Sequence, residues 1–364
     1  MTTTTAGTST TASTASASTA SAIDRSREMA ASLESDPDRH RMLTGDRPTG
    51  DLHIGHFLSS LRNRVALQDR GVESLVLIAD YQVITDRDSV GQLKANTLSL
   101  LTDYLAAGID PSRSTVFTHS SVPALNQLML PFLSLVTQAE LQRNPTVKDE
   151  LRASRRPLSG LLLTYPVHQA ADILFCKADV VPVGRDQLPH VEQTRVVARR
   201  FNARYAAGSP VFPEPVALVN DQQLVLGLDG EKMSKSRGNV IPLAATADET
   251  TALVRKARTD SDPVITYEPE RRPEVANLLN IASGFTGVPP EQLATGLGAG
   301  GGRALKELVS ESVNEGLRRH RERRATYAAD PAQLREILRA GNAAARVIAD
   351  RTLAEVREVM SMDY

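Results

Sequence analysis

The chain has 364 residues, which is enough for two domains and a sizeable core. Its formal net charge of -1 excludes a general attraction for polyanions, so any contact with nucleic acid has to come from local basic patches. No apolar run approaches the roughly 18 residues that a membrane span needs, and we expect a soluble, cytoplasmic protein.

The chain begins with a low-complexity segment. Residues 1 to about 22 are almost wholly Thr, Ser, Ala and Gly, a composition that buries too little apolar surface to order itself. The segment lacks the basic start and the apolar core of a secretory signal. We therefore predict a disordered tail over residues 1–38. Organelle import remains an alternative, because plastid transit peptides are also rich in Ser and Thr and poor in acidic residues.

A strand, a loop and a helix are predicted next. The apolar run Met42–Thr44 indicates a short strand, Gly45–Gly50 is rich in turn residues, and residues 53–69 have a helical pattern. The loop is not a Walker A motif, because Asp51 and Leu52 stand where that motif needs Lys and Ser or Thr. Free backbone amides and the positive end of the helix dipole nevertheless make such a junction suitable for binding phosphate.

The first turn of this helix carries three residues suited to a nucleotide. Gly55 has no side chain, so a phosphate or a base can approach the backbone closely. His53 and His56 are three residues apart, lie on one face of the turn and can donate to phosphate oxygens. Taken alone, the histidine pair is more typical of a surface or capping feature.

Strand and helix patterns alternate through the first two thirds of the chain. This alternation predicts an α/β fold with a doubly wound parallel sheet, a Rossmann-like catalytic domain over residues 39–244, whose ligands bind beyond the carboxyl ends of the strands. The predicted strands are Met42–Thr44, Leu75–Ala79, Thr115–Thr118 and Val180–Val183, and the predicted helices cover roughly 53–69, 90–107, 123–141, 157–176 and 186–204.

Two loops and one cysteine stand out within this alternation. Asp80–Thr85 and Gly184–Gln187 each follow a predicted strand, so both lie at the edge of the sheet where ligands bind. Cys176 is the single cysteine and follows an apolar run without a Cys or His at zinc-ligand spacing. We interpret it as a buried thiol in a reducing compartment.

A second polar loop contains two lysines. Lys232–Ser236 reads Lys-Met-Ser-Lys-Ser and is flanked by glycines, namely Gly227, Gly230 and Gly238. Mobile ammonium groups in such a loop can neutralise a leaving pyrophosphate, and no metal ligand is needed for this. On its own, a loop of this kind is usually only solvated.

Beyond the lysine loop the pattern becomes helical. Residues 245–364 predict a second, helical domain whose last helix packs back on the catalytic domain. The segment Gly296–Gly301 satisfies Gly-x-Gly-x-x-Gly, but no strand precedes it, and we interpret it as a loop between helices. A basic patch, Arg318–Arg324, is either a solvated helix face or a contact for nucleic acid.

The two polar motifs, in this order, resemble the ATP signatures of the class I aminoacyl-tRNA synthetases. Residues between Arg41 and Met360 are similar, more narrowly, to the bacterial tryptophanyl-tRNA synthetases. The segments that carry this likeness are Thr44–His56, Arg143–Lys148, Tyr165–Pro166, Gln169–Ile173, Val181–Gln187, Glu192–Arg195 and Gly227–Lys232.

The resemblance implies a function and its partners. The expected reaction is activation of L-tryptophan by ATP to tryptophanyl-adenylate and pyrophosphate, followed by transfer of tryptophan to tRNA(Trp). It implies that no covalent enzyme intermediate forms. It also implies that Mg²⁺ is bound together with ATP and is not held by a set of protein ligands. It also implies a homodimer, for which Leu125–Leu141 is either an interface or a buried helix, and contact between the anticodon and the helical domain.

Residue roles follow from the same resemblance. His53, His56, Lys232 and Lys235 are the expected catalytic residues. The expected ATP-binding residues are Arg47, Pro48, Thr49, Gly55, His56, Gly184, Arg185, Asp186, Val225, Lys232, Met233, Ser234, Lys235 and Ser236. Val225 matches only loosely, because the loop before Lys232 is shorter than in close relatives.

The expected tryptophan-binding residues are centred on Asp172. A carboxylate only accepts hydrogen bonds and the indole N–H only donates, so Asp172 suits tryptophan. Tyr165 and Gln169 share its helical face at i, i+4 and i+7 spacing. The remaining members of this set are Gln187, Gln82 and Gly45.

Three alternatives remain open at this point. The tyrosyl enzymes use the same Tyr-x-x-x-Gln-x-x-Asp pattern, a synthetase-like paralogue would keep the fold without aminoacylation, and simple nucleotidyltransferases share the histidine loop. Gln82 and Gln169 stand where many bacterial tryptophanyl enzymes have His and Met. We therefore expect the pocket to handle inhibitors that mimic tryptophan differently.

Overall fold

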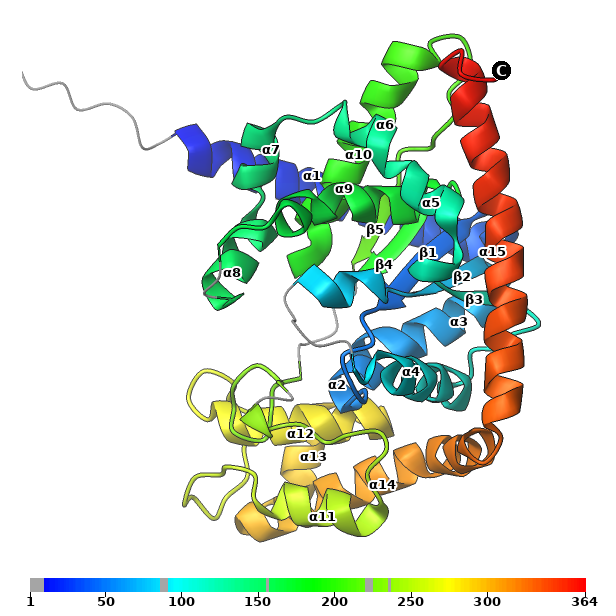
Figure 1. Ribbon diagram of the computed structural model, residues 1–364. Coiled ribbons are helices and arrows are strands. Elements are labelled where there is room, and N and C mark those ends of the chain that lie inside the picture. The colour runs from blue at the N-terminus through cyan, green and yellow to red at the C-terminus, as the bar shows by residue number, and fades with distance from the viewer. Residues whose placement is uncertain (1–9, 86–90, 155–156, 220–224, 235–236) are drawn as a thin grey trace, which may run out of the picture.

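A computed structural model describes residues 10–85, 91–154, 157–219, 225–234 and 237–364. Five parallel strands form one sheet in the order β3-β2-β1-β4-β5 (Figure 1). They are β1 (Arg41–Asp46), β2 (Glu73–Ile78), β3 (Ser114–Thr118), β4 (Val180–Val183) and β5 (Val216–Val219). The predicted parallel α/β sheet is confirmed, and β5 is the strand that the sequence did not predict.

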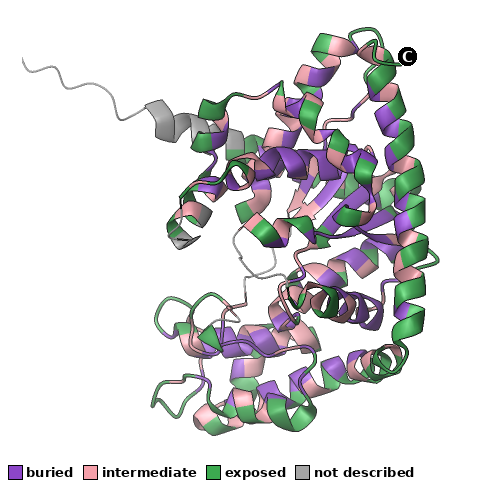
Figure 2. Ribbon diagram, viewed as in Figure 1, coloured by how far each residue is buried: buried purple, intermediate pink, exposed green. Residues whose placement is uncertain are grey.

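Helices cover both faces of the sheet. Apolar side chains of the strands alternate between two clusters, because successive residues of a strand point to opposite faces. Leu75, Leu77 and Phe117 pack with α5 (Pro123–Gln127), α9 (Gly160–Leu174) and α10 (Leu188–Tyr205). Val76 and Ile78 pack on the other face with α2 (Ile54–His56) and α4 (Leu93–Ala107). Figure 2 shows the centre of the sheet and most of α9 buried, whereas β5 at the edge is mostly of intermediate burial.

Shorter helical segments connect these elements. They are η1 (Pro37–Arg39), a π-helical turn η2 (Phe57–Leu61), α3 (Arg62–Arg70), η3 (Tyr81–Thr85), η4 (His119–Ser121), α6 (Met129–Leu133), α7 (Gln138–Arg143), α8 (Pro145–Ser154) and η5 (Arg185–Gln187). Leu125, Leu128 and Phe132 are fully buried in the core, so this part of the expected interface segment is a core element.

The prediction of a disordered tail is wrong for residues 19–35. They belong to α1 (Thr10–Ser35), whose residues Ala22 and Leu33 are 3% and 1% exposed. The Ser26 hydroxyl accepts a hydrogen bond of 2.9 Å from the Val219 amide of β5, and Arg25 pairs with Glu192 at 2.5 Å. The helix forms because its apolar residues share one face, which covers the β5 side of the sheet. Residues 1–9 lie outside the described part of the chain.

The remaining helices follow the lysine loop. α11 (Ala247–Arg255), α12 (Pro273–Thr286), α13 (Pro290–Leu297) and α14 (Gly301–Ala328) form a lobe below the sheet in Figure 1. The segment with the dinucleotide-like pattern connects α13 to α14, as predicted. None of the described helices is long and apolar enough to cross a membrane.

The last helix, α15 (Pro331–Val359), leaves this lobe and runs back along the catalytic domain (Figure 1). The Asn342 side-chain oxygen accepts a hydrogen bond from the Thr118 amide at the end of β3. A Cβ at Gly341 would lie 1.9 Å from the Val116 carbonyl oxygen, so only glycine allows this close approach. Ala345 and Ala349 are buried in the same core as the strands.

Candidate active site

A cavity of about 920 Å³ lies at the carboxyl ends of β1 and β4. Its wall unites the four segments that the sequence singled out: the loop after β1 with α2, the polar face of α9, the turn after β4, and the lysine loop. The predicted residues among those that line it are Gly45, Arg47, Thr49, His53, Gly55, His56, Gln82, Tyr165, Gln169, Asp172, Gly184, Arg185, Asp186, Gln187, Val225, Lys232 and Met233.

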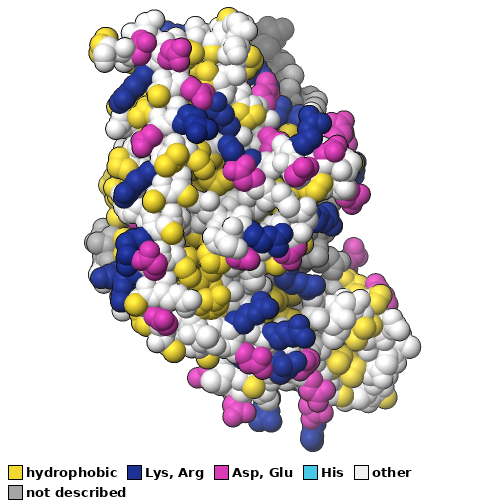
Figure 3. All heavy atoms as spheres, turned by 90° about the vertical axis from the view of Figure 1, so that its right-hand side faces the viewer, with side chains coloured by type: hydrophobic (Ala, Val, Ile, Leu, Met, Phe, Trp, Pro, Cys, Tyr) yellow, Lys and Arg dark blue, Asp and Glu magenta, His cyan; other side chains and the backbone are white. Residues whose placement is uncertain are grey.

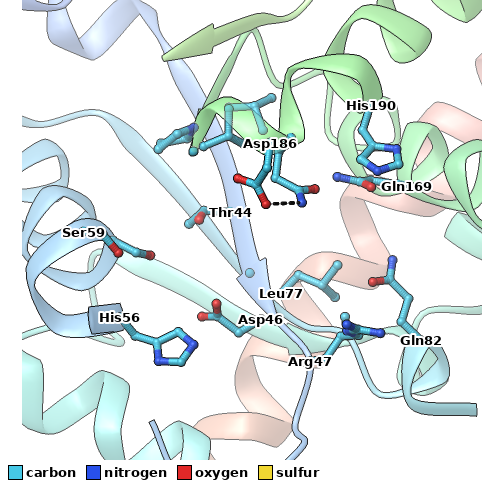
Figure 4. Close-up of a pocket in the computed structure, with 18 of the residues that line it drawn as sticks. Thr44, Asp46, Arg47, His56, Ser59, Leu77, Gln82, Gln169, Asp186 and His190 are labelled. Atoms are coloured by element: carbon cyan, nitrogen blue, oxygen red, sulfur yellow. Dashed lines mark hydrogen bonds between the residues drawn. The ribbon is translucent and has the colours of Figure 1, made fainter. Parts of the chain in front are cut away.

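Figure 4 shows how these side chains are divided. Asp46 and His56 project from the β1–α2 side, and Gln169 and His190 from the opposite side. Asp186 accepts a hydrogen bond of 3.2 Å from the side-chain amide of Gln187. Pro48 and Ser234 are not among the lining residues, and the predicted residues Lys235 and Ser236 lie outside the described part of the chain.

The histidine turn is closed by its own side chains. His53 precedes α2, and its backbone amide donates to His56 Nδ1 at 3.3 Å. The two imidazole rings lie 3.8 Å apart. Ile54 between them is fully buried and its amide donates to the Ile241 carbonyl. The buried isoleucine therefore anchors a turn whose polar residues line the cavity.

Gly55 brings the histidine turn against the lysine loop. A Cβ at this position would lie 2.8 Å from the Met233 sulfur and 2.9 Å from the His53 ring. Both distances are below 3.0 Å, so a methyl group at this position would force the Met233 or His53 side chain to move. The close approach places Lys232 and His56 on one cavity.

Asn239 holds the lysine loop in shape. Its side-chain oxygen accepts from the Ser234 amide at 2.8 Å, and its side-chain nitrogen donates to Asp229 at 2.7 Å. It is 4% exposed. Sequence reasoning missed this residue, although an Asn beside a glycine after a polar loop is a common signal of a turn.

A buried polar network supports the floor of the site. Asp46, the last residue of β1, pairs with Arg64 of α3 at 2.6 Å and accepts from the Tyr104 hydroxyl of α4 at 2.7 Å. Burial alone would raise the pKa of Asp46, but the Arg64 guanidinium outweighs it and lowers the pKa to about 2. Burial raises the pKa of Tyr104. The carboxylate is therefore ionised and its charge is matched within the protein.

The predicted tryptophan reader, Asp172, is 2% exposed and already has two protein partners. Its Oδ1 accepts from His119 Nε2 at 2.7 Å, and its Oδ2 accepts from the Gln82 side-chain amide at 3.3 Å. Sequence reasoning missed His119. Its place directly after β3, at the ligand-binding edge of the sheet, was the available signal.

Earlier in the same helix, the Tyr165 hydroxyl lies 3.2 Å from His190 Nε2. Burial lowers the pKa of His190 to about 4, so the ring is neutral at pH 7. A neutral ring can accept from the Tyr165 hydroxyl, which fixes this side chain at the cavity wall. His190 was not predicted from the sequence.

Among the described residues, His119, His168 and Asp172 are spaced closely enough to hold a metal ion. However, His119 Nε2 is hydrogen-bonded to Asp172 Oδ1, and His168 Nε2 lies 2.8 Å from the Asn126 side-chain oxygen. These side chains therefore form hydrogen bonds within the protein. Cys176 is buried, as predicted, and burial raises the pKa of its thiol to about 12.

Comparison with known proteins identifies the family. The family model described as class I tRNA synthetases (W and Y) matches residues 36–318. A tryptophan--tRNA ligase of Clostridium longisporum is 40% identical over 333 residues, which are 89% of this chain and 97% of that protein. One from Streptococcus agalactiae is 39% identical over 89% of this chain and 98% of its own. The chain belongs to the tryptophan--tRNA ligase family.

Solved structures of this family have the same fold. Tryptophanyl-tRNA synthetase from Campylobacter jejuni, complexed with ADP and tryptophan, is 31% identical with a TM-score of 0.76, covering 88% of this chain and 99% of that one. The Mycoplasma pneumoniae enzyme is 27% identical with a TM-score of 0.75, covering 88% and 97%. The prediction of a tryptophan--tRNA ligase rather than a tyrosyl enzyme is confirmed by these relatives.

Proposed function

We propose that this protein activates L-tryptophan with ATP and transfers it to tRNA(Trp) at the cavity described above. The main observation behind this proposal is that the histidine turn, Lys232 and the buried Asp172 carboxylate all line the same cavity. Adenylation of an indole amino acid requires a cavity that binds the phosphates of ATP at one end and accepts a hydrogen bond from the indole N–H at the other.

In the first step, the tryptophan carboxylate attacks the α-phosphorus of ATP in line, and pyrophosphate leaves with the bonding electron pair. His53 and His56 donate to phosphate oxygens, and Lys232 offsets the charge that builds up on the leaving group. Gly55 leaves room for the lysine loop to approach the histidine turn. We assign Lys235 the same role as Lys232, and assign Arg47, Thr49 and Asp186 to holding the nucleotide.

In the second step, a ribose hydroxyl of the tRNA attacks the carbonyl carbon of the adenylate, and AMP leaves. The cavity needs no covalent intermediate on the protein, so binding and orientation supply the catalysis. Mg²⁺ would enter with ATP, bound by phosphates and water rather than by a protein cage. The cytoplasm remains the predicted location and a homodimer the predicted assembly.

Contact with tRNA is assigned to exposed arginines of α14. Arg321 and Arg324 donate hydrogen bonds within the protein, Arg321 to the Ala245 carbonyl and Arg324 to the Asp103 carboxylate. Arg319 and Arg323 are exposed. On the face that carries α15, basic and acidic side chains are interspersed rather than gathered in one stripe (Figure 3). We therefore narrow the predicted anticodon patch to Arg319 and Arg323.

Exchange of labelled pyrophosphate into ATP tests the proposal. We expect exchange that depends on tryptophan and is absent with tyrosine or phenylalanine. A matched reaction with tRNA and labelled tryptophan separates transfer from activation. Exchange with neither amino acid would support a paralogue that has lost the activity, and exchange with tyrosine alone would refute the assignment of Asp172 to an indole.

A further inference from the structure

His119 lies between two carboxylates at the amino acid end of the cavity. It is the first residue of η4, directly after β3, and is fully buried. Its Nε2 lies 2.7 Å from Asp172 Oδ1, and its Nδ1 lies 3.9 Å from Asp80 Oδ1. Since a carboxylate only accepts, Nε2 carries the hydrogen that it donates to Asp172.

The carboxylate behind His119 is itself fixed. Asp80 accepts from the Tyr81 amide at 3.0 Å, from the Ser120 amide at 3.1 Å and from the Ser120 hydroxyl. It is 7% exposed. The Tyr81 ring stacks on the imidazole with 6.2 Å between the ring centres. The imidazole is therefore stacked on one face by Tyr81 and faces the Asp80 carboxylate at Nδ1 without a hydrogen bond to it, and among the described residues its only hydrogen bond is the one to Asp172.

The consequence concerns which oxygen of Asp172 a substrate can meet. Oδ1 is occupied by His119, whereas Oδ2 has only the 3.3 Å contact with the Gln82 amide. Gln82 and Asp172 both line the cavity, and His119 does not. A fixed Oδ1 sets the direction in which Oδ2 presents its lone pairs.

We propose that His119 is a positioning residue that makes the pocket selective for a side chain with an N–H donor. Through its hydrogen bond to Oδ1 it holds the Asp172 carboxylate so that Oδ2 accepts the indole hydrogen. This inference rests on the proposed function, because it assumes that Asp172 reads the substrate. It adds a residue that touches no substrate and acts only through Asp172.

His168 offers a matched control. It is buried beside the same carboxylate, with its ring 4.5 Å from that of His119, but its Nε2 lies 2.8 Å from Asn126. Burial lowers the pKa of His168, so its ring is neutral at pH 7. A substitution here disturbs the same core without removing a hydrogen bond to Asp172.

The test compares tryptophan with β-(benzothiophen-3-yl)alanine, in which sulfur replaces the N–H group. The measured quantity is kcat/KM for pyrophosphate exchange with each amino acid, and their ratio is the selectivity for N–H. We expect His119→Phe to lower kcat/KM for tryptophan about 10- to 100-fold, in keeping with loss of a hydrogen bond to a charged group, and to change that for the sulfur analogue less than about threefold.

Two further variants sharpen the result. His119→Gln should restore the ratio, because its amide nitrogen reaches the position of Nε2, whereas His119→Asn is too short and should behave like His119→Phe. His168→Gln should leave the ratio unchanged. If His119→Phe does not fold, as judged by circular dichroism, His119→Asn decides the question.

An equal loss for both amino acids, or an unchanged ratio in His119→Phe or His119→Asn, would overturn the inference. Asp172→Ala separates this failure from that of the proposed function. A wild-type protein without tryptophan-dependent exchange contradicts the proposed function itself, and an unchanged ratio in Asp172→Ala contradicts the assignment of Asp172 to the indole. Loss of selectivity in Asp172→Ala together with full selectivity in His119→Phe contradicts only the role of His119.

Discussion

Replacing Arg64 by Met would leave Asp46 as a carboxylate without its cation. Arg64 is 4% exposed at the side chain and Asp46 is 20% exposed, and they lie 2.6 Å apart. Breaking a buried ion pair costs about 3–5 kcal/mol. The lowering of the pKa of Asp46 from 3.8 to about 2 corresponds to about 2 kcal/mol. We expect Arg64→Met to lower the free energy of unfolding by about 2–4 kcal/mol at pH 7.

The pH dependence of this loss has a definite sign. Because folding depresses the pKa of Asp46, the stability that it contributes is fully present above pH 4 and is lost as pH falls towards 2. Arg64→Met removes this contribution, so the difference between variant and wild type should shrink over that window. Urea unfolding followed by circular dichroism at pH 7, 4 and 3 measures it.

The double variant Asp46→Asn/Arg64→Met supplies the control. The asparagine side chain is neutral and still accepts from the Tyr104 hydroxyl, so most of the lost stability should return. Asp46 also lines the cavity, and its unmatched charge in Arg64→Met should raise KM for ATP, with recovery in the double variant. A loss that is the same at pH 7 and pH 3, or that the second substitution leaves unchanged, would refute the charge argument.

Two other predictions concern catalysis and tRNA. Gly55→Ala places a methyl group 2.8 Å from the Met233 sulfur and should separate the two signature motifs. We expect kcat for pyrophosphate exchange to fall at least about tenfold, with a small change in Tm. A folded variant with the wild-type kcat would contradict this prediction. Arg319→Ala with Arg323→Ala should weaken tRNA binding and reduce the slope of log K against log salt by about 2, leaving exchange unaffected. An unchanged slope would remove these residues from the interface.

The sequence predicted the parts of the fold that depend on neighbouring residues. Four strands were predicted because each is a short apolar run that ends in a turn or a helix start. β5 was missed because Val216–Val219 has three half-buried members and directly follows Pro215. In α1, the Ser- and Ala-rich background concealed the buried face of Ala22, Met29 and Leu33.

The residues of the site likewise divide into those that local sequence predicts and those that only the fold brings together. Residues of the two signature motifs and of α9 were predicted, since each motif is local. The partners that hold them come from far along the chain: His119 is 53 residues from Asp172, and Tyr104 is 58 residues from Asp46. A hydrogen bond between distant elements leaves no periodic trace in a single sequence, so only the folded structure reveals it.

The return of α15 to β3 has a consequence for the synthesis of the protein. Ala345, Ala349 and Val356 fill the same core as Phe117 and Phe175, and the Thr352 hydroxyl donates to the Phe175 carbonyl at 2.6 Å. The ribosome makes these residues after every strand of the sheet and after α11–α14. Until they leave its exit tunnel, the sheet has an uncovered apolar flank and the nascent chain cannot complete its catalytic core. The catalytic domain therefore completes its folding only after the helical lobe and α15 have been synthesised.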